Sequence, residues 1–291
     1  MSQFSHTKTL FHLPSNVVYL DGNSLGPMPL AAREHVATMM GNEWGEQMIK
    51  GWNNAGWMSL STQIGDRIAP LIGAEPGHVI MGDTLSIKVH QALGAALALN
   101  PGRKVILSDY GNFPSDLYMA QGLIKMLDRG HTLKIVAPED VSHHIDDEVA
   151  VLMLTEVDYR TGRKHDMKAL TATAHAHGVI TLWDLAHSVG ALPVDLMGSR
   201  VDFAVGCTYK YLNGGPGAPA FIYACPGYVN KIEPTLSGWL GHAAPFDFEL
   251  DYRAAHGIER LRVGTPPVIA LKCLEPALDI WDLVTIDQVR K

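Results

Sequence analysis

The sequence predicts an α/β protein with a mainly parallel sheet flanked by helices. Three observations indicate this class: short apolar runs rich in β-branched residues, segments of helical periodicity between them, and turn residues at their junctions. The apolar runs do not alternate with polar residues, which is typical of parallel strands buried on both faces. The predicted strands are residues 79–81, 104–109, 149–155, 179–184 and 201–206.

The segments between these strands carry apolar residues at helical spacing. One stripe runs through residues 57–71 and ends at Gly73, because glycine favours the left-handed conformation that follows a helix. A second stripe covers residues 89–97 and ends before Pro101. A third helix is expected to begin near Pro114, since proline suits the first turn of a helix.

A fourth helix is expected to follow Asp166 as its N-cap and to run to Gly178. Strand and helix therefore alternate, which is the pattern of an open sheet with helices on both faces. We expect an N-terminal segment over residues 1–55 and a large domain over residues 56–265. A further helical pattern follows, and we expect residues 266–291 to begin a small C-terminal domain that the sequence leaves incomplete.

Composition excludes several classes of function. The chain has 291 residues, is 47% hydrophobic and carries a formal net charge of -7, with its Lys and Arg residues dispersed. We therefore expect no nucleic acid and no membrane as a partner. The N-terminus lacks a signal-peptide pattern and no apolar run reaches the roughly 18 residues of a membrane span, so a cytoplasmic location is expected.

Neither cysteine nor histidine spacing predicts a metal site. Cys207, Cys225 and Cys273 are too far apart for a zinc knuckle or a small disulfide framework, and we expect them to be reduced. His175 and His177 come where the fourth helix ends, and imidazoles there complement the helix dipole.

Asp184 and Lys210 are the first candidates for chemistry. Ligands of open α/β sheets bind outside the carboxyl ends of the strands, and Asp184 ends a predicted strand. A carboxylate keeps a pyridine ring protonated, and a lysine amine forms a Schiff base with an aldehyde, so the two suit pyridoxal phosphate. Taken singly, Asp184 is equally a helix cap and Lys210 a solvated surface lysine. The glycine-rich run at residues 214–217 allows tight backbone beside a ligand, although glycines also mark plain turns.

Five sequence blocks stand out along essentially the whole length. They are YLDGNSLG at 19–26, GNFPSDLY at 111–118, DLAHSVG at 184–190, TYKYLNGGPG at 208–217 and GWLGH at 238–242. In this order the blocks resemble those of kynureninases. The blocks at 184–190 and 208–217 are shared with the wider class V aminotransferase group, whereas those at 111–118 and 238–242 are specific to kynureninases.

The resemblance implies a fold type I pyridoxal phosphate enzyme and a role for each matching residue. It implies that Lys210 is the Schiff-base lysine, that Asp184 faces the pyridine nitrogen and that His187 lies near the ring substituents. Phe113 is implied to stack on the ring face, as aromatic side chains do on planar ligands; its plain alternative is a core phenylalanine.

The phosphate is expected at a helix start, where free N–H groups and the helix dipole favour an anion. The resemblance implies Leu85 and Ser86 there, with Asp116 and Trp239 completing the region. Thr265 matches a polar position that approaches the phosphate in dimers of the family.

Tyr209 and Ser24 complete the expected site. Tyr209 is implied as the proton donor to the substrate β-carbon, with a hydrogen bond to the phosphate as its alternative, and Ser24 as a substrate contact. The implied reaction is hydrolytic cleavage of L-kynurenine or 3-hydroxykynurenine in tryptophan degradation, to anthranilate or its 3-hydroxy form and L-alanine. A homodimer is also implied.

Two departures from the family accompany the match. Lys88 replaces a neutral asparagine one turn into the phosphate helix, where it would either strengthen anion binding or face solvent. The arginine that binds the substrate carboxylate in this family belongs to the C-terminal domain, and no residue is assigned to that role.

Two other functions compete with this interpretation. One is another class V reaction, desulfuration or transamination; desulfuration requires a nucleophilic thiol on a mobile loop, and Cys207 instead lies at an apparent strand end. The other is a non-catalytic protein that keeps the cofactor-domain fold and serves as a binding partner.

Overall fold

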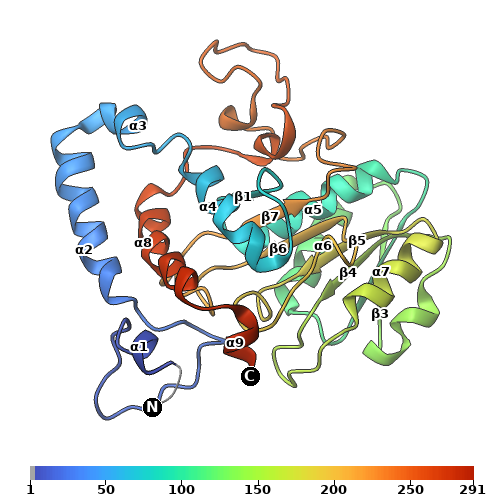
Figure 1. Ribbon diagram of the computed structural model, residues 1–291. Helices are drawn as coiled ribbons and strands as arrows, with labels where there is room; N and C mark the ends of the chain where they lie inside the picture. Colours follow the sequence, from blue (N-terminus) through green and yellow to red (C-terminus); the bar gives the residue numbers. More distant parts are fainter. Residues whose placement is uncertain (1–3) are drawn as a thin grey trace.

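The computed structural model describes residues 4–291 and contains one seven-stranded sheet, in the order β1-β7-β6-β5-β4-β2-β3. Helices cover both faces of this sheet (Figure 1). The strands are β1 (Val79–Met81), β2 (Val105–Asp109), β3 (Thr132–Val136), β4 (Val149–Thr155), β5 (Ile180–Asp184), β6 (Phe203–Gly206) and β7 (Phe221–Ala224).

The centre of the sheet is parallel, as the sequence predicts, and one edge is not. Strands β3, β2, β4, β5 and β6 are parallel neighbours. Strand β7 is antiparallel to both β6 and β1, so β1 runs in the direction of the parallel strands, as expected, but pairs only with the reversed strand β7. All three residues of β1 are buried, and burial alone does not determine which strand it pairs with.

The predicted helices are present near their predicted limits, with Gly73 in the left-handed conformation and Asp166 capping α7 through its carboxylate. The α-helices are α1 (Ser5–Lys8), α2 (Leu30–Thr38), α3 (Gly51–Asn54), α4 (Leu60–Ile68), α5 (Leu85–Leu99), α6 (Pro114–Leu127), α7 (Met167–Ala176), α8 (Val268–Asp279) and α9 (Ile286–Arg290). The 3₁₀ and π segments are η1 (Met39–Glu46), η2 (Met48–Lys50), η3 (Ala69–Ile72), η4 (Pro138–His144), η5 (Trp239–Gly241), η6 (Gly257–Leu261) and η7 (Ile280–Leu283).

A hydrophobic core lies on each face of the sheet, and β4 contributes side chains to both cores. All seven of its residues are buried. Leu152 and Leu154 pack into the core under α4, α7 and α8, whereas Val151 and Met153 pack into the core under α5 and α6. The double burial accounts for the continuous apolar run in the sequence.

Helix α8 belongs to the first of these cores, because its Leu271 and Leu274 are fully buried there together with Ile64 of α4. The separation of residues 266–291 into a small domain stays a prediction. In Figure 1, α2 lies at the side of the sheet next to α8, and the loop between η5 and η6, drawn in orange, projects at the top.

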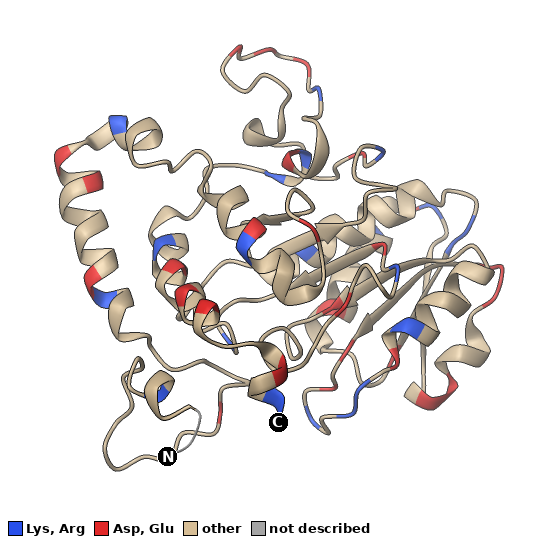
Figure 2. Cartoon of the chain, viewed as in Figure 1, with Lys and Arg blue, Asp and Glu red and all other residues tan. Residues whose placement is uncertain are grey.

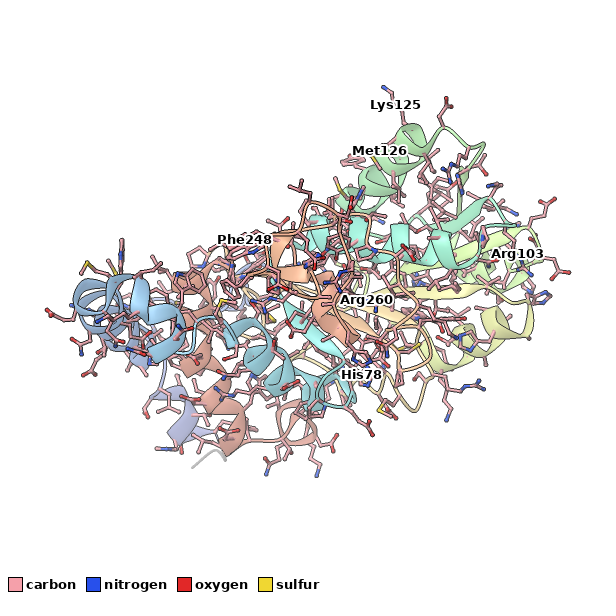
Figure 3. The ribbon with its side chains drawn as sticks, turned by 90° about the horizontal axis from the view of Figure 1, so that it is seen from above. His78, Arg103, Lys125, Met126, Phe248 and Arg260 are labelled. Carbon is pink, nitrogen blue, oxygen red and sulfur yellow. The ribbon has the colours of Figure 1, made fainter. Side chains whose placement is uncertain are left out.

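A buried arginine ties the segment before η6 to the body of the protein. The Arg260 guanidinium donates to the carbonyl oxygens of Ala255 (3.1 Å) and Ile232 (2.9 Å), and Figure 3 shows it among the side chains near the middle of the molecule. Buried carbonyls need such donors, so Arg260 fixes this long irregular segment.

Charged residues are scattered over the helices and loops, with acidic and basic side chains interspersed (Figure 2). Within residues 4–291, no helix is both long enough and apolar enough to cross a membrane.

Candidate active site

The connections of the sheet create a crevice at the carboxyl ends of its strands. From β2 the chain crosses to β3 on one side, and from β3 it returns to β4 on the other side of β2. The segments that leave β2 and β4 therefore diverge, and such a switch point is where open α/β sheets bind ligands. The predicted residues Phe113 and Asp116 follow β2, and Asp184 ends β5.

Asp184 is held on the floor of this crevice. It lies opposite Thr155 of β4 in the parallel register, and its side chain is buried at 4% exposure. Its carboxylate accepts hydrogen bonds from the Thr155 hydroxyl (2.9 Å) and from the Ala186 backbone N–H (2.9 Å). Burial nevertheless raises the pKa of Asp184. Each oxygen of the Asp184 carboxylate can accept one more hydrogen bond. Because its pKa is also raised, the carboxylate is suited to bind the N–H of a ligand ring.

Lys210 follows the end of β6, and a tight turn presents it to Asp184. The Asn213 N–H donates to the Lys210 carbonyl (3.0 Å), and the Gly214 N–H donates to the Thr208 carbonyl (2.8 Å). A Cβ at position 214 would lie 3.0 Å from that Thr208 oxygen, which explains the glycine. Lys210 is only 7% exposed, so the expectation of a solvated surface lysine does not hold.

The amine of Lys210 lies 2.7 Å from Nε2 of His187. Burial, together with the nearby Lys210 charge, lowers the pKa of His187 to about 4, so its imidazole is neutral at pH 7. Its other ring nitrogen, Nδ1, is buried and has no hydrogen-bond partner among the described residues. A neutral imidazole beside the lysine leaves the amine free to act on an aldehyde or a proton.

Phe113 and Asp116 come from the start of α6. The Asn112 side chain accepts from the Phe113 N–H (2.8 Å), and the Phe113 ring lies 5.8 Å from the Lys210 ammonium nitrogen. Asp116 is 1% exposed, and burial together with the charge of Asp184 raises its pKa well above the usual range. Its Oδ1 has no partner within residues 4–291, as for Nδ1 of His187.

Tyr209 and Cys207 flank the lysine. The Tyr209 ring lies 5.7 Å from the Lys210 amine, and burial raises the pKa of its phenol, so it keeps its proton at neutral pH. Burial also raises the pKa of Cys207 to about 12, and the thiol is only 2% exposed. The Cys207 thiol is therefore protonated at neutral pH and shielded from solvent, which disfavours a thiolate nucleophile at this position.

Leu85 and Ser86 form the first turn of α5, and no side chain caps this helix start within the described chain. Thr84 precedes the helix in an extended conformation and leaves the first N–H groups without a side-chain acceptor. An exposed helix start of this kind fits a phosphate group.

Lys88 is fully buried one turn further on, so it does not face solvent. Its amine donates to the Gln91 side chain (2.9 Å) and to the Leu261 carbonyl (3.3 Å), and it lies 3.4 Å from the Asp83 carboxylate. Lys88 thus joins the segment before α5 to η6. Burial lowers its pKa to about 8 despite the opposing charge of Asp83.

This burial predicts an unusual pH dependence of stability. The folded-state pKa of Lys88, about 8, lies below its ordinary value of 10.5, so between these values the unfolded chain binds more protons than the folded one. The free energy of unfolding is then expected to rise with pH across this window, by on the order of 3 kcal/mol from Lys88 alone. Denaturant titrations at pH 8 and pH 10.5 measure it, with Lys88→Met as the matched variant. Other titrating groups contribute equally to both proteins, so parallel pH profiles would contradict the prediction.

The side chains of the remaining predicted residues have no described contact with the Lys210 amine. Trp239 is 42% exposed, donates from its indole to the Pro245 carbonyl and packs on Phe246. Thr265 is exposed and lines a small cavity with Lys88. The roles of Trp239 and Thr265 stay predictions.

Ser24 lies in a turn and donates to the Asp21 carboxylate (2.9 Å). The same turn reaches the lysine segment, because the Gly26 N–H donates to the Tyr209 carbonyl (2.8 Å). Ser24 is thus placed beside the lysine strand end, and its substrate contact stays a prediction.

Sequence reasoning missed three residues at this site. Thr155 orients Asp184, Asn112 caps Phe113, and Tyr159 stacks against His187 at a centroid distance of 6.3 Å. Thr155 carried a usable signal, since it ends a predicted strand next to the Asp184 strand. Tyr159 carried none, because it lies in an irregular loop.

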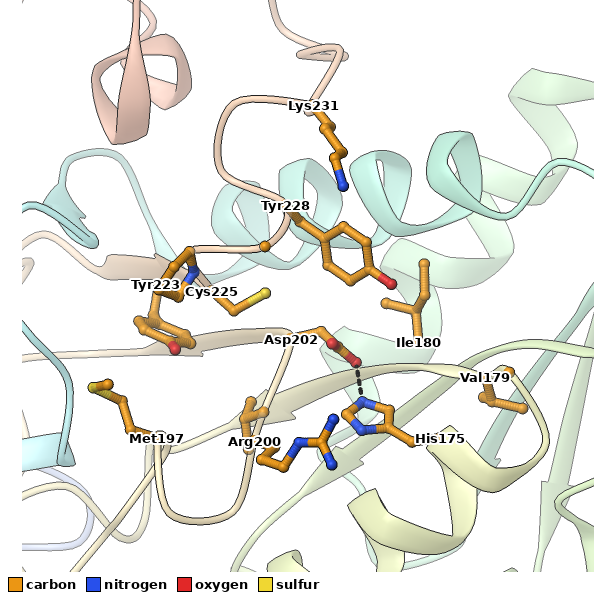
Figure 4. Close-up of a pocket in the computed structure, with 14 residues that line it drawn as sticks. His175, Val179, Ile180, Met197, Arg200, Asp202, Tyr223, Cys225, Tyr228 and Lys231 are labelled. Carbon is orange, nitrogen blue, oxygen red and sulfur yellow. Dashed lines mark hydrogen bonds and ion pairs between the residues drawn. The ribbon is translucent and has the colours of Figure 1, made fainter.

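A separate cavity of about 520 Å³ opens at the opposite edge of the sheet, near the starts of β5 and β6. Figure 4 shows its walls, with His175 bonded to Asp202 and with Arg200, Tyr228 and Lys231 around the opening. It contains none of the predicted site residues. The His175 imidazole instead joins α7 to the Asp202 carboxylate (2.9 Å).

The residues around Lys210 fit pyridoxal phosphate. Two buried polar atoms without described partners, Oδ1 of Asp116 and Nδ1 of His187, belong to residues in contact with or electrostatically coupled to the lysine. Buried polar atoms are rarely left unsatisfied, so they indicate a polar ligand between them. Lys210 would hold its aldehyde, Asp184 its ring nitrogen and Phe113 its face.

The fold and this arrangement define the class of protein. The family model described as "Aminotransferase class-V" matches residues 54–291, so the chain belongs to the class V aminotransferase family. A solved structure of a C-DES mutant, with glycine covalently linked to its PLP cofactor, has the same fold at a TM-score of 0.84. It is 19% identical, and the match covers 95% of this chain and 74% of that chain.

Within this class, the chain belongs to the kynureninase family. It is 47% identical to a kynureninase from Deinococcus radiodurans over 99% of this chain and 71% of that protein. It is 48% identical to a kynureninase from Burkholderia pseudomallei over 97% of this chain and 69% of that protein.

Proposed function

We propose that the chain is a pyridoxal phosphate-dependent kynureninase. It cleaves the Cβ–Cγ bond of L-kynurenine, of its 3-hydroxy derivative, or of both, with one water, to give anthranilate or 3-hydroxyanthranilate and L-alanine. The observation that carries the proposal is the buried Lys210 amine, which is surrounded by His187, Phe113, Asp116 and Tyr209 in a chain nearly half identical to kynureninases. Desulfuration and transamination are not favoured.

Each residue has a task in this reaction. When bound, pyridoxal phosphate supplies an aldehyde that condenses with amines and a ring that takes up electron density. Lys210 would hold that aldehyde, and its amine, once released, is placed to take the proton from the substrate α-carbon. Asp184 would bind the protonated ring nitrogen, and its raised pKa would strengthen that hydrogen bond. Phe113 would pack against the ring.

Cleavage then requires water at the γ-ketone and a proton at the β-carbon. Water adds to the ketone, and the Cβ–Cγ bond breaks with its electron pair left on the β-carbon. Tyr209 gives the proton to that carbon, because its raised pKa keeps the phenol protonated and it lies beside Lys210. His187 stays neutral and so does not compete for the lysine proton.

The proposal includes a homodimer in the cytoplasm that serves tryptophan degradation, as the family resemblance implies. Large apolar side chains near the N-terminus support a partner for that surface. Val18 and Leu20 lie two residues apart in the chain and are both 86% exposed. Exposed apolar groups gathered in one region are typical of protein interfaces.

The test is a fluorescence assay for anthranilate after L-kynurenine is added to the protein loaded with pyridoxal phosphate. We expect anthranilate and L-alanine in equal amounts. Cysteine is the matched control substrate, and no sulfide is expected from it because Cys207 is buried. A protein that binds the cofactor, yet forms no anthranilate, would contradict the proposal and favour a non-catalytic role.

A further inference from the structure

The buried carboxylate of Asp109, the last residue of β2, joins two segments of the candidate active site. Its Oδ1 accepts from the Gly111 N–H (2.8 Å). Its Oδ2 accepts from the His165 imidazole (2.6 Å) and from the Arg163 guanidinium (3.3 Å). Gly111 belongs to the turn before α6, whereas Arg163 and His165 belong to the loop after β4. One carboxylate therefore holds this turn and this loop together.

The turn before α6 carries Phe113. The Asn112 side chain accepts from the Phe113 N–H (2.8 Å) and donates to the Met153 carbonyl of β4 (3.3 Å). The Phe113 ring lies 5.8 Å from the Lys210 amine. The bonds of this turn thus decide where the Phe113 ring stands beside the lysine.

The loop after β4 carries a second aromatic ring of the site, that of Tyr159. The Asp158 N–H donates to the Arg163 carbonyl (2.9 Å), which closes the loop on itself. At its tip the Tyr159 ring meets the Phe113 ring edge-on at 5.0 Å and 73°, and it stacks on the His187 ring at 6.3 Å and 27°. A movement of this loop would therefore move the packing around Phe113 and His187.

His165 makes the stronger of the two side-chain bonds from this loop to Asp109. Its imidazole is buried, packs edge-on against Trp183 of β5 at 6.1 Å and 68°, and lies 2.6 Å from the carboxylate. The His165 N–H also donates to the Glu156 carbonyl (2.9 Å). The side chain of Arg163 is 37% exposed and its bond is longer, so solvent weakens it. Short buried bonds to a carboxylate are the strong ones.

We propose that His165 is a positioning residue of the reaction and that its bond to Asp109 fixes the rings of Phe113 and Tyr159 beside Lys210. This inference rests on the proposed function. Phe113 would pack against the cofactor ring and Tyr159 packs on Phe113, so a shift of either ring changes the place of the reacting atoms relative to the lysine amine. Such shifts are costly, because a misplacement of about 1 Å lowers a rate by up to about 10²-fold.

The experiment compares two substitutions of His165. His165→Phe keeps a planar ring against Trp183 and loses the bond to Asp109, whereas His165→Gln keeps an N–H donor in place of Nε2 and loses the ring. For His165→Phe we expect kcat to fall about 10- to 100-fold with KM within about twofold. The circular dichroism of the bound cofactor is expected to weaken, because the ring is held less uniquely. His165→Gln is expected to recover most of both properties.

A second measurement uses the protein without cofactor. In His165→Phe the amide hydrogens of residues 111–113 are expected to exchange with solvent faster, because the carboxylate that anchors this turn has lost its buried partner. If His165→Phe does not fold, His165→Asn replaces it. Asparagine carries the same amide as glutamine on a shorter side chain, which does not reach Asp109, so the two amides are compared directly.

His175→Phe is the matched control. His175 also bonds to a buried carboxylate, that of Asp202 at 2.9 Å, at the opposite edge of the sheet. This variant is expected to lose stability while kcat, the cofactor circular dichroism and amide exchange at residues 111–113 stay unchanged. A folded His165→Phe with normal kcat and normal circular dichroism would overturn the inference. An equal fall in His175→Phe would also overturn it, because the effect would then be one of general stability.

Failure of this inference differs from failure of the proposed function. Circular dichroism and amide exchange do not require carbon–carbon cleavage. If both respond to His165→Phe in a protein that forms no anthranilate, the positioning role is supported and the kynureninase reaction is contradicted. If His165→Phe forms anthranilate at the normal rate, the reaction stands and His165 has no positioning role.

Discussion

Lys210→Ala is expected to abolish both the absorbance band of the lysine-linked cofactor and the formation of anthranilate. The lysine is the covalent tether and the base for the α-proton, and it is the amine that lies against His187. Loss of the proton transfer alone is expected to lower kcat by about 10²- to 10⁴-fold, and loss of the tether adds to this. Absorbance spectroscopy and the fluorescence assay measure the two effects separately.

Lys272→Ala is the control for this experiment. Lys272 is also largely buried, at 8% exposure, and lies 3.1 Å from the Glu275 carboxylate and 3.5 Å from the Glu43 carboxylate. Its replacement removes two ion pairs and no proposed cofactor contact. A normal cofactor band in Lys210→Ala, or its loss in Lys272→Ala, would place the tether elsewhere.

Asp184→Asn is the second variant with a large expected effect. Asparagine has the same shape but cannot keep a proton on the pyridine nitrogen, so the ring withdraws less electron density from the α-carbon. We expect kcat to fall about 10²- to 10³-fold, the usual loss when one group aimed at developing charge is removed. Cofactor binding is expected to persist, because Lys210 and the helix start at Leu85 are unchanged.

The same variant is expected to keep or gain stability. Burial raises the pKa of Asp184, so keeping this carboxyl ionised costs free energy in the folded protein. Asparagine removes that penalty, and its amide can still bond to Thr155 and to the Ala186 N–H. Asp202→Asn is the control, since Asp202 is a buried strand-end carboxylate at the opposite edge of the sheet. It is expected to leave kcat unchanged, and a matching loss there would contradict the role of Asp184.

Much of the fold is predictable because burial on both faces leaves a clear sequence pattern. The runs that form β2, β4, β5 and β6, and the cap at Asp166, are where the sequence indicates. Strands β3 and β7 were missed, and the sequence did not indicate that β7 runs against its neighbours. Strand direction depends on which connection the chain follows between β6 and β7, and apolar residues are the same in either direction.

The residues of the candidate site likewise differ in whether the sequence could predict them. Asp184 and Lys210 were predictable, because a strand-end carboxylate and a lysine before a glycine-rich turn suit one cofactor, and because the surrounding blocks resemble a family. Tyr159 was not, since an irregular loop has no period and its contacts with Phe113 and His187 arise only from tertiary packing. Lys88 could be located in the phosphate helix from the sequence, but its complete burial could not be predicted.

The parallel register that places Thr155, Asp184 and Val205 side by side has a consequence for assembly of the enzyme. Thr155 and Asp184 end their strands and Val205 is the last residue but one of β6, so the floor of the site cannot open unless the middle of the sheet opens. Amide hydrogens of β4, β5 and β6 are therefore expected to exchange with solvent among the slowest in the protein, even before the cofactor is present. The cofactor then binds to a sheet that is already folded, so the rate of cofactor binding does not depend on folding of the sheet.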